Sequence, residues 1–316
     1  MAQPTPSGVH IDAALTNISV AYIQSRTNFI ASRVFPRVPV SKQTDKYFTY
    51  TKNDWFRDEA ELRPPATESA GSGFGLSTGD YSCDVFAIHK DLDDQTLANA
   101  DAPLNLEAAA AEFVAQRMLL RHEIEWADAF FTTGVWATDN TSATDWDNYT
   151  TSTPLLDVET GRGAILSTTG MLANTLVLGY DVYAALKNHP DFVDRISPTS
   201  SEVVSQQIMA RLFEVDQIYV ARAVKATNNE GETAAYGFVQ GDNALLCYVP
   251  PSPNLLTPSA GYTFEWTGVS DGAGETIGTV RIPIPEKRAV RIESQMGWDS
   301  KVIASDLGYF FSDLTS

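Results

Sequence analysis

The serine at position 270 lies in the setting closest to a catalytic motif. Gly268-Val-Ser270-Asp-Gly272 satisfies the GxSxG pattern, in which a nucleophilic serine stands exposed on a sharp turn between a strand and a helix. Here Ala-Gly-Glu275 and then a β-rich run follow, which is typical of a loop between strands. We therefore expect Ser270 to be a loop residue, and a hydrolase that uses Ser270 is the alternative from another functional class.

A second segment has part of the pattern of a nucleotide-binding loop. Gly71-Ser-Gly73-Phe-Gly75 is rich in glycine, but it opens no helix and lacks the Lys-Ser/Thr pair that a P-loop needs to hold phosphates. These residues are better explained as the tip of a hairpin.

The metal-ligating residue types do not gather into a recognisable site. His122-Glu123 lacks the second histidine of HExxH, and Asp91, Asp93 and Asp94 lack the glycine and glutamate of an EF-hand loop. We interpret the three aspartates as solvated turn residues. His189 precedes a proline at a helix end, where a cation would complement the helix dipole.

Two further groups have a structural interpretation that is simpler than a functional one. Glu123 and Glu125 are two apart on a helix and point to different faces, so they cannot act as a carboxylate pair. Tyr47, Phe48 and Tyr50 could stack on single-stranded bases but are typical of a half-buried strand. The sequence thus predicts no catalytic, cofactor-binding or metal site, and no enzyme.

The charge distribution suggests an arm on an acidic body. The chain has a net charge of −18, which argues against a protein that grips nucleic acid over most of its surface. Residues 1–57 nevertheless carry three anions and seven cations, which are Arg26, Arg33, Arg37, Lys42, Lys46, Lys52 and Arg57. This asymmetry favours an arm that lies on an acidic surface, its own or a neighbour's. A local fluctuation on a solvated surface is the alternative.

The remaining bulk properties are those of a folded cytoplasmic chain. A hydrophobic fraction of 43% suits a globular protein, and we find neither a transmembrane stretch nor a secretory signal. We therefore expect synthesis and folding in a cytoplasm. Cys83 and Cys247 have no metal-ligand spacing, and two buried free thiols are favoured over a disulfide.

The first third of the chain contains unusual elements. Residues 34–40 hold two prolines and should be extended without a full ladder. Strands at Lys46–Thr51 and Asp80–Ile88 flank a long tip rich in glycine and proline, which predicts an extended hairpin. Because an isolated hairpin is marginally stable in water, this one requires a partner.

One long helix is the strongest local signal. Apolar residues at three- and four-residue steps predict a helix over about 104–133, with Asp101 or Asn105 as its cap and Gly134 near its end. Polar residues, Glu123 among them, fall between the apolar ones. Such a helix is roughly 42 Å long, which is long for a compact domain of this size.

The rest of the chain has a mixed pattern. Between 155 and 250 helices alternate with strands, and the strands are Thr175–Gly179, Gln217–Val224 and Ala244–Val249. The tail is nearly all strand, at Thr279–Ile284, Arg288–Glu293, Lys301–Ala304 and Tyr309–Phe311.

This order of elements resembles the order in the major capsid proteins of tailed bacteriophages, which have the Hong Kong 97 type fold. Three segments of the sequence also resemble parts of that family. Thr175 to Pro190 is similar to that family's strand, turn and helix, including an Asn-His-Pro stop. Gly237 to Pro251 resembles its later strand and proline exit, and Trp298 to Phe311 resembles its closing strands. The likeness covers essentially the whole chain, and it is architectural only in the first third.

The resemblance implies an α+β fold with four parts. These are an N-terminal arm (1–45), an extended hairpin called the E-loop (46–88), a peripheral domain with the spine helix (89–154 and 268–316), and a mixed α/β axial domain (155–267). It also implies a structural protein of the virion, assembled in the host cytoplasm, whose pentamers and hexamers form an icosahedral head around double-stranded DNA. No membrane partner is implied.

The resemblance suggests roles for two groups of charged residues. We expect four residues near the hairpin tip to contact adjacent subunits: Arg57, Glu59, Glu61 and Arg63. We expect Arg26, Arg33 and Arg37 of the arm to lie toward the acidic spine or the packaged genome, with non-specific contacts to DNA.

Some features of the family are absent or left open. The sequence as given begins without the helical, charged scaffolding segment that some members carry, so either scaffolding is a separate protein or this chain is a processed form. The initial Met favours a separate scaffolding protein, and we also expect a portal. A decoration protein is compatible with the sequence, and no Lys–Asn cross-link is predicted because no local signature marks a pair. The main alternative is a bacterial nanocompartment shell of the encapsulin type, which encloses an enzyme cargo.

Overall fold

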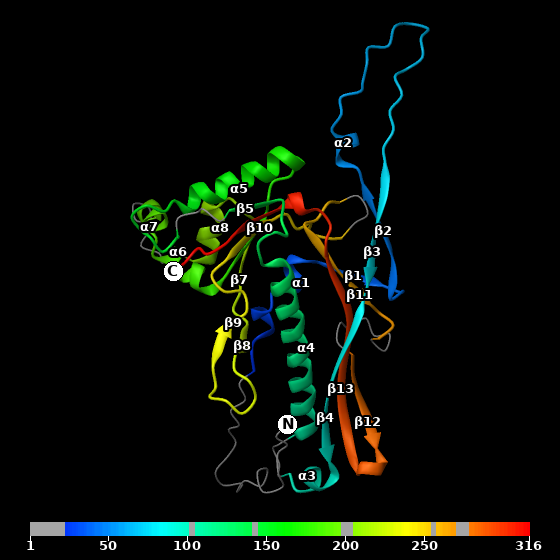
Figure 1. Cartoon of the computed structure of the whole chain (residues 1–316), viewed down its shortest axis with the longest axis vertical. Helices are drawn as coiled ribbons and strands as arrows, with labels where there is room; N and C mark the ends of the chain where they lie inside the picture. Colours follow the sequence, from blue (N-terminus) through cyan, green and yellow to red (C-terminus); the bar gives the residue numbers. More distant parts are fainter. Residues whose placement is uncertain (1–22, 101–104, 141–144, 197–204, 254–256, 270–277) are drawn as a thin grey trace.

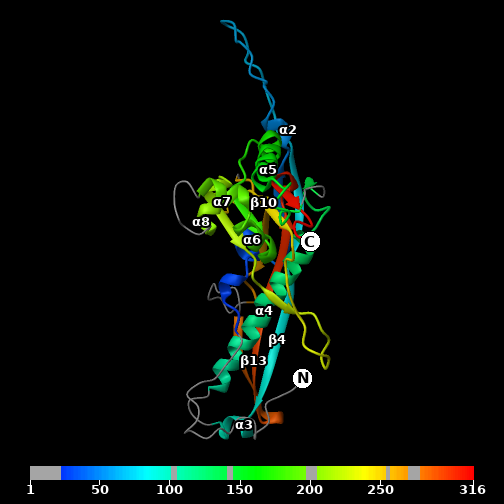
Figure 2. The same cartoon turned by 90° about the vertical axis from the view of Figure 1, so that its left-hand side faces the viewer.

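The computed structural model describes residues 23–100, 105–140, 145–196, 205–253, 257–269 and 278–316. The molecule is elongated, with a thin hairpin at one end of its long axis and a long helix beside a sheet at the other (Figure 1). A mixed α/β block lies to one side, and a quarter turn shows the hairpin, helix and sheet following one line (Figure 2). No helix among the described residues is long and apolar enough to cross a membrane.

The first sheet is organised around one long strand. Its strands are β1 (Arg37–Val40), β4 (Asp84–Asp93), β11 (Gly261–Trp266), β12 (Gly278–Ile284) and β13 (Ala289–Val302). One edge of β13 pairs antiparallel with β4, and its other edge pairs antiparallel with β12 and then β11. β1 adds a parallel strand beside β11 at the sheet edge, where Pro39 is tolerated.

The long strand joins two segments that the sequence pattern had separated. Arg288–Glu293 and Lys301–Ala304 were predicted as two strands, but β13 is continuous from Ala289 to Val302. Its residues alternate between buried and half-buried positions from Val290 to Met296, because one face packs against the long helix. Local composition hides this continuity, since Ser294, Gln295 and Gly297 are weak strand formers.

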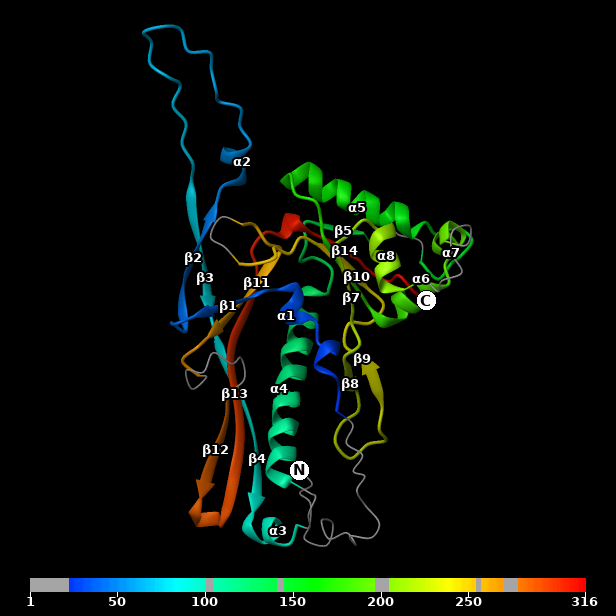
Figure 3. The same cartoon turned by 180° about the vertical axis from the view of Figure 1, so that it is seen from behind.

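The spine helix, α4 (Leu106–Phe130), packs along β4 and β13 (Figure 3). Asn105 caps it by accepting the backbone N–H of Ala108 at 3.0 Å, which confirms one of the two predicted caps. Buried residues recur on α4 at four-residue steps, and Ala110, Val114, Met118 and His122 face the sheet, whereas Trp126 packs against Phe35 of the arm. The helix ends at Phe130, before the predicted residue 133, and the ring of the next residue, Phe131, is buried against Phe310.

The second sheet lies in the α/β block. Its strands follow the order β5 (Thr138–Asn140), β14 (Gly308–Phe311), β10 (Ala244–Cys247), β6 (Thr175–Leu178) and β7 (Gln217–Val220). In the described part of the block the helices are α5 (Pro154–Thr169), α6 (Tyr180–Lys187), α7 (Pro190–Ile196) and α8 (Gln206–Leu212). Every residue of β6, β10 and β14 is buried, which explains their continuous apolar runs.

The hairpin is shorter at its base than predicted. β2 (Thr44–Tyr50) pairs antiparallel with β3 (Leu76–Ser82), and α2 (Lys52–Trp55) follows β2. The predicted second strand, Asp80–Ile88, is wrong as one element, because the chain changes partner at the buried Cys83 and continues as β4 beside β13. Where the chain changes strand partner, the Ser82 N–H donates to Asp299 Oδ2 at 2.8 Å.

The remaining elements are short. They are η2 (Arg26–Asn28), α1 (Ala31–Val34), α3 (Asp94–Ala98), β8 (Val224–Ala226), β9 (Tyr236–Phe238), η3 (Pro285–Lys287) and η4 (Ser305–Leu307). The strand predicted to run from Gln217 to Val224 is divided between β7 and the small β8–β9 hairpin. Thr199-Ser-Ser-Glu202 has the pattern of a capping box, which would open a helix, but these residues lie outside the described part of the chain.

Strand pairing does not follow the predicted segments at every point. β5 and β14 come from segments assigned to the peripheral domain, yet they pair in the sheet of the α/β block. β11 comes from the segment assigned to the axial domain, yet it pairs with β13. Pairing alone does not divide a chain into domains, so the four boundaries stay a prediction.

Candidate assembly surfaces

Most residues that could have done chemistry have structural partners. Ser270 lies outside the described residues, and Gly71 and Gly73 are exposed near the hairpin tip with open space around them. Cys83 and Cys247 are free and buried, as predicted, and burial raises the pKa of their thiols to about 11 and about 12. Neither thiol is therefore a nucleophile at neutral pH.

The interpretation of the three aspartates as solvated turn residues was wrong for Asp91 and Asp93, whereas Asp94 is exposed as the first residue of α3. Asp91 and Asp93 belong to β4, where Asp91 is paired with Arg291 at 2.7 Å and Asp93 caps α3 through the backbone N–H of Thr96. The bonds from Arg291 and Thr96 lower the pKa of the two carboxyls. In the described part of the chain, no three His, Cys, Asp or Glu side chains are arranged to hold a metal ion.

A serine–histidine pair lies in the α/β block, but its hydrogen bonds do not activate the serine. The Asp191 N–H donates to His189 Nδ1 at 3.1 Å, so neutral His189 carries its hydrogen on Nε2, which lies 2.9 Å from Ser152 Oγ. The Ser152 hydroxyl donates in turn to the carbonyl of Asn148 at 2.7 Å. The proton of Ser152 is therefore directed away from the imidazole, the reverse of a catalytic pair.

The role predicted for His189 is also corrected. Its side chain is buried, and burial lowers its pKa, so the ring is not the cation that would complement the dipole of α6. Instead, Nδ1 accepts an N–H at the start of α7. The charge state of the ring depends on how deeply the side chain is buried, which the local sequence does not show.

His122 and Glu123 are both buried on α4 and face different neighbours. The His122 ring meets Trp298 of β13 edge-on, and burial lowers its pKa to about 3. Glu123 faces the arm, where it accepts the backbone N–H of Ile30. Glu125 is half-buried and pairs with Arg121, with 3.6 Å between Arg121 Nε and Glu125 Oε2. The structure confirms that the two glutamates form no pair, but it contradicts the expectation that Glu123 belongs to the polar face.

Two of the three aromatic residues of β2 pack against other rings of the chain. Tyr47 stacks on Phe264 with 5.3 Å between ring centroids, and Tyr50 contacts the rings of Trp55 and Phe74. Phe48 is exposed. These contacts are those of strand residues at the root of a hairpin.

The hairpin tip, residues 55–78, has no buried residue. All four charged residues predicted as contacts lie in it, and Arg57 approaches Glu59 at 3.8 Å while Arg63 Nε donates to the carbonyl of Thr67 at 2.6 Å. Sequence reasoning missed the exposed apolar side chains beside them, which are Trp55, Phe56, Leu62, Phe74 and Leu76. Large apolar residues within a polar loop rich in glycine and proline were the signal for this surface.

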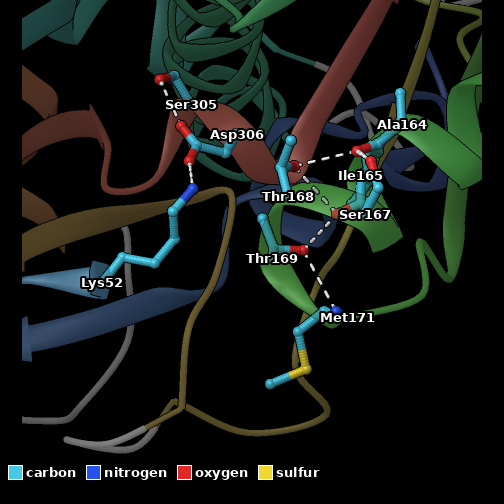
Figure 4. A network of polar contacts seen from close by, with 9 residues as sticks. All are labelled: Lys52, Ala164, Ile165, Ser167, Thr168, Thr169, Met171, Ser305 and Asp306. Atoms are coloured by element: carbon cyan, nitrogen blue, oxygen red, sulfur yellow. Dashed lines mark hydrogen bonds and ion pairs between the residues drawn. The ribbon is translucent and has the colours of Figure 1, made fainter. Parts of the chain in front are cut away.

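The hairpin root is attached to the body of the molecule. Lys52 of α2 forms an ion pair with Asp306 of η4, beside the last turn of α5 (Figure 4). In that turn the Thr168 and Thr169 hydroxyls donate to backbone carbonyls of Ala164 and Ile165. Gly170, in a left-handed conformation at φ 69°, ends α5 near the Phe56 ring. The root is therefore held, while the part of the tip beyond Phe56 projects away from the body (Figure 1).

The arm is packed inside its own chain. Ile30, Ala31, Val34 and Phe35 are at most 1% exposed and belong to the same core as Trp126 and the strands of the α/β block. The Gln24 side chain pairs with both backbone groups of Val224, at 2.7 and 3.0 Å. The Gln24 carbonyl also accepts from Gln116 of α4 at 2.9 Å. The described part of the arm thus connects the spine helix with the α/β block.

The three arginines of the arm are not brought together. Arg26 is exposed, and Arg33 is exposed with its guanidinium 5.9 Å from the centre of the Tyr219 ring. Arg37 is half-buried in β1, where burial lowers its pKa and the charge of Glu265 opposes that shift. Their contacts with a genome stay a prediction.

Comparison with known proteins places this geometry among capsid proteins. No family model matches the chain. The chain is 27% identical over 270 residues to the major capsid protein of Burkholderia phage BcepMu, covering 82% of this chain and 84% of that one. It is 27% identical over 314 residues to the major capsid protein of Pseudomonas phage JBD67, covering 96% of both.

Solved structures share the fold. The crystal structure of a phage-related protein from Bordetella bronchiseptica has a TM-score of 0.71 and 25% identity, over 92% of this chain and 93% of that one. The mature capsid protein of bacteriophage PhiM1 has a TM-score of 0.59 at 11% identity, over 97% and 93%. An encapsulin from Synechococcus elongatus has a TM-score of 0.56 at 13% identity, over 97% of each chain. These likenesses confirm the predicted capsid fold.

Proposed function

We infer that the chain is a phage major capsid protein, a structural protein of the virion shell and not an enzyme. Two relatives with that name align with most of the sequence, and the fold is that of phage capsid subunits. The surface of the chain should therefore contain the contacts through which many copies assemble.

The exposed hairpin tip is the observation in the structure that carries this function. Leu62 is 96% exposed, and Phe74 and Phe56 are more than half exposed on a projection that touches little of its own chain. Exposed apolar side chains gathered on one element mark an interaction surface. A second copy of the chain is the partner that an assembling shell supplies.

The finer assembly is part of the proposal. Pentamers and hexamers would close an icosahedral head around double-stranded DNA, which the protein would contact without sequence specificity. Contacts between different surfaces of identical subunits close into rings when the rotation permits, and a hairpin that reaches one neighbour is a contact of this kind. A separate scaffolding protein and a portal, and assembly in the host cytoplasm, belong to the same proposal.

The charged residues of the tip would tune the contacts between subunits. Arg57, Glu59, Glu61 and Arg63 are all exposed beside the apolar side chains, so they can pair with a neighbour at small desolvation cost. Within the arm, Arg26 and Arg33 are exposed and remain the candidates for contact with the genome, whereas Arg37 lies in a sheet strand.

A nanocompartment shell is the second candidate. Its support is the fold likeness to an encapsulin at 13% identity, which concerns the fold alone. The names of the two sequence relatives favour the phage shell. Neighbouring genes for a terminase, a portal and a tail, as opposed to a cargo enzyme with a docking tail, would distinguish the two.

Negative-stain electron microscopy of the purified chain, with a sizing column, tests the proposal. We expect closed particles, or rings with five- and six-fold symmetry, from the chain alone or from co-expression with the neighbouring genes of its source. A protein that stays monomeric under all of these conditions would contradict a shell function.

A further inference from the structure

The carboxyl group of Glu123 joins three segments that are distant in the sequence. Its side chain is fully buried in the second half of α4. Oε2 accepts the backbone N–H groups of Ile30 at 3.0 Å and of Ala31 at 2.9 Å, at the start of α1 in the arm. Oε1 accepts the side-chain amide of Gln240, which follows β9. One group therefore fastens the arm to the spine helix and to the α/β block.

Gln240 allows this junction to hold a proton. Its Oε1 is buried and has no hydrogen-bond partner among the described residues. A half turn of the amide about its last torsion would place this acceptor against Glu123 Oε1 and would move the amide donor away. The turned amide could then accept a hydrogen bond from a protonated Glu123. In both arrangements Glu123 Oε2 keeps its two bonds to the arm.

Charged side chains near the junction do not compensate an ionised Glu123. The neighbouring elements carry Arg33 on α1, Arg37 on β1, Arg121, His122 and Glu125 on α4, and Asp242 beyond Gln240. None of them contributes to the pKa of Glu123, which burial raises from an ordinary 4.5 to about 7 against the opposing effect of three hydrogen bonds. A buried carboxylate without a cation is costly, and a proton removes that cost.

We propose that Glu123 and Gln240 form a proton-dependent latch for the N-terminal arm, in which protonated Glu123 holds the arm most firmly and ionised Glu123 loosens it. The latch belongs to the single chain and does not depend on shell formation.

The direction of the pH dependence follows from linkage. If the arm leaves, solvent reaches Glu123 and its pKa returns toward 4.5, whereas with the arm seated it is about 7. The seated state therefore binds the proton more tightly. Seating should strengthen as the pH falls from about 7 to about 4.5, by up to about tenfold per pH unit, and should be constant outside that window.

Hydrogen exchange of the full-length chain tests the latch. Exchange of the Ile30 and Ala31 amides would be followed from about pH 5 to about pH 9, relative to the amides of Leu245 and Leu246 in β10, which correct for the intrinsic effect of pH. In the wild type, relative protection of the two arm amides should fall as the pH rises to about 7. Protection that does not change over this range would overturn the proposal.

Two variants separate the latch from general stability. Glu123→Gln imitates the protonated form, since its carbonyl can accept from the arm and its amide can donate to Gln240, so protection should stay high at every pH. Glu123→Met fills a similar volume without a hydrogen-bond acceptor, so both arm amides should exchange roughly tenfold faster, or more, at every pH. A Gln variant with the pH dependence of the wild type, or a folded Met variant with full protection, would contradict the latch. If the Met variant does not fold, the wild type and the Gln variant decide the question.

Discussion

The arm and the hairpin tip are the two regions whose sequences suggested extended chain in need of a partner, and they end in opposite environments. Ile30, Val34 and Phe35 of the arm are buried in the core of their own chain, whereas Leu62 and Phe74 of the tip remain exposed. The arm therefore contributes to the folding of one subunit. The tip is left for contacts between subunits, so mutations in the two regions should produce different defects.

The comparison is tested most strongly by Phe35→Ala. The Phe35 ring is fully buried and contacts Trp126, Phe130 and Trp136, with ring centroids 4.9 to 6.3 Å apart. Its truncation should lower the free energy of unfolding by about 3–5 kcal/mol. Urea unfolding of the unassembled chain measures the loss. Phe74→Ala in the tip is the matched control and should cost about 1 kcal/mol or less; an equal loss in both variants would contradict the distinction.

A smaller effect, on assembly and not on folding, is expected from Leu62→Ser. A neighbouring subunit that buries this side chain gains about 1.5–3 kcal/mol, so its loss should raise the critical concentration for shell formation roughly ten- to hundredfold. The free energy of unfolding of the single chain should not change. Light scattering over a concentration series measures assembly, and wild-type assembly by this variant would mean that Leu62 stays in solvent.

Charge reversal in the tip should have a weaker effect. Arg57→Glu together with Arg63→Glu should weaken each contact by about 0.2–1 kcal/mol, and the effect should diminish at high salt. The same double substitution with lysine keeps the charge and serves as the control. Equal assembly of both variants at low salt would rule out a role of these charges in subunit contacts.

The smallest effect is expected at the hairpin root. Lys52→Ala removes the ion pair with Asp306, in which both side chains are more than a third exposed. The cost to stability should be about 0.5 kcal/mol or less, since such pairs are screened by solvent. Hydrogen exchange in β2 and β3 should nevertheless become faster, because the root loses a contact with the body. Unchanged exchange there would show that the other contacts of the root, such as Tyr47 with Phe264 and Ser82 with Asp299, hold it without the ion pair.

Local patterns predicted the elements that depend on near neighbours along the chain. The three- and four-residue spacing of apolar side chains predicted α4, and the run Thr175–Gly179 predicted a strand that is present as β6. The polar side chain of Asn105 predicted the start of the spine helix. Each of these depends on residues a few positions apart, so the sequence alone is sufficient for them.

The failed predictions concern contacts between distant residues. Cys83 marks a change of strand partner that depends on the distant β13, and the charge state of His189 depends on burial among other elements. The spine helix also has two packing surfaces, because β13 covers one side and the arm covers the other. A helical pattern read for a single apolar face therefore assigned Glu123 to the polar side.

The sequence by itself determined the order of the elements, the long helix, the absence of a recognisable catalytic motif and the resemblance to capsid proteins. Only the tertiary structure decided that the arm is buried in its own chain and that the hairpin tip is not. It also brought Glu123 to the N–H groups of Ile30 and Ala31, across a separation of about 90 residues. The physical reason is that propensity and periodicity act over a few residues, whereas burial and strand partners depend on segments that meet only after the chain has folded.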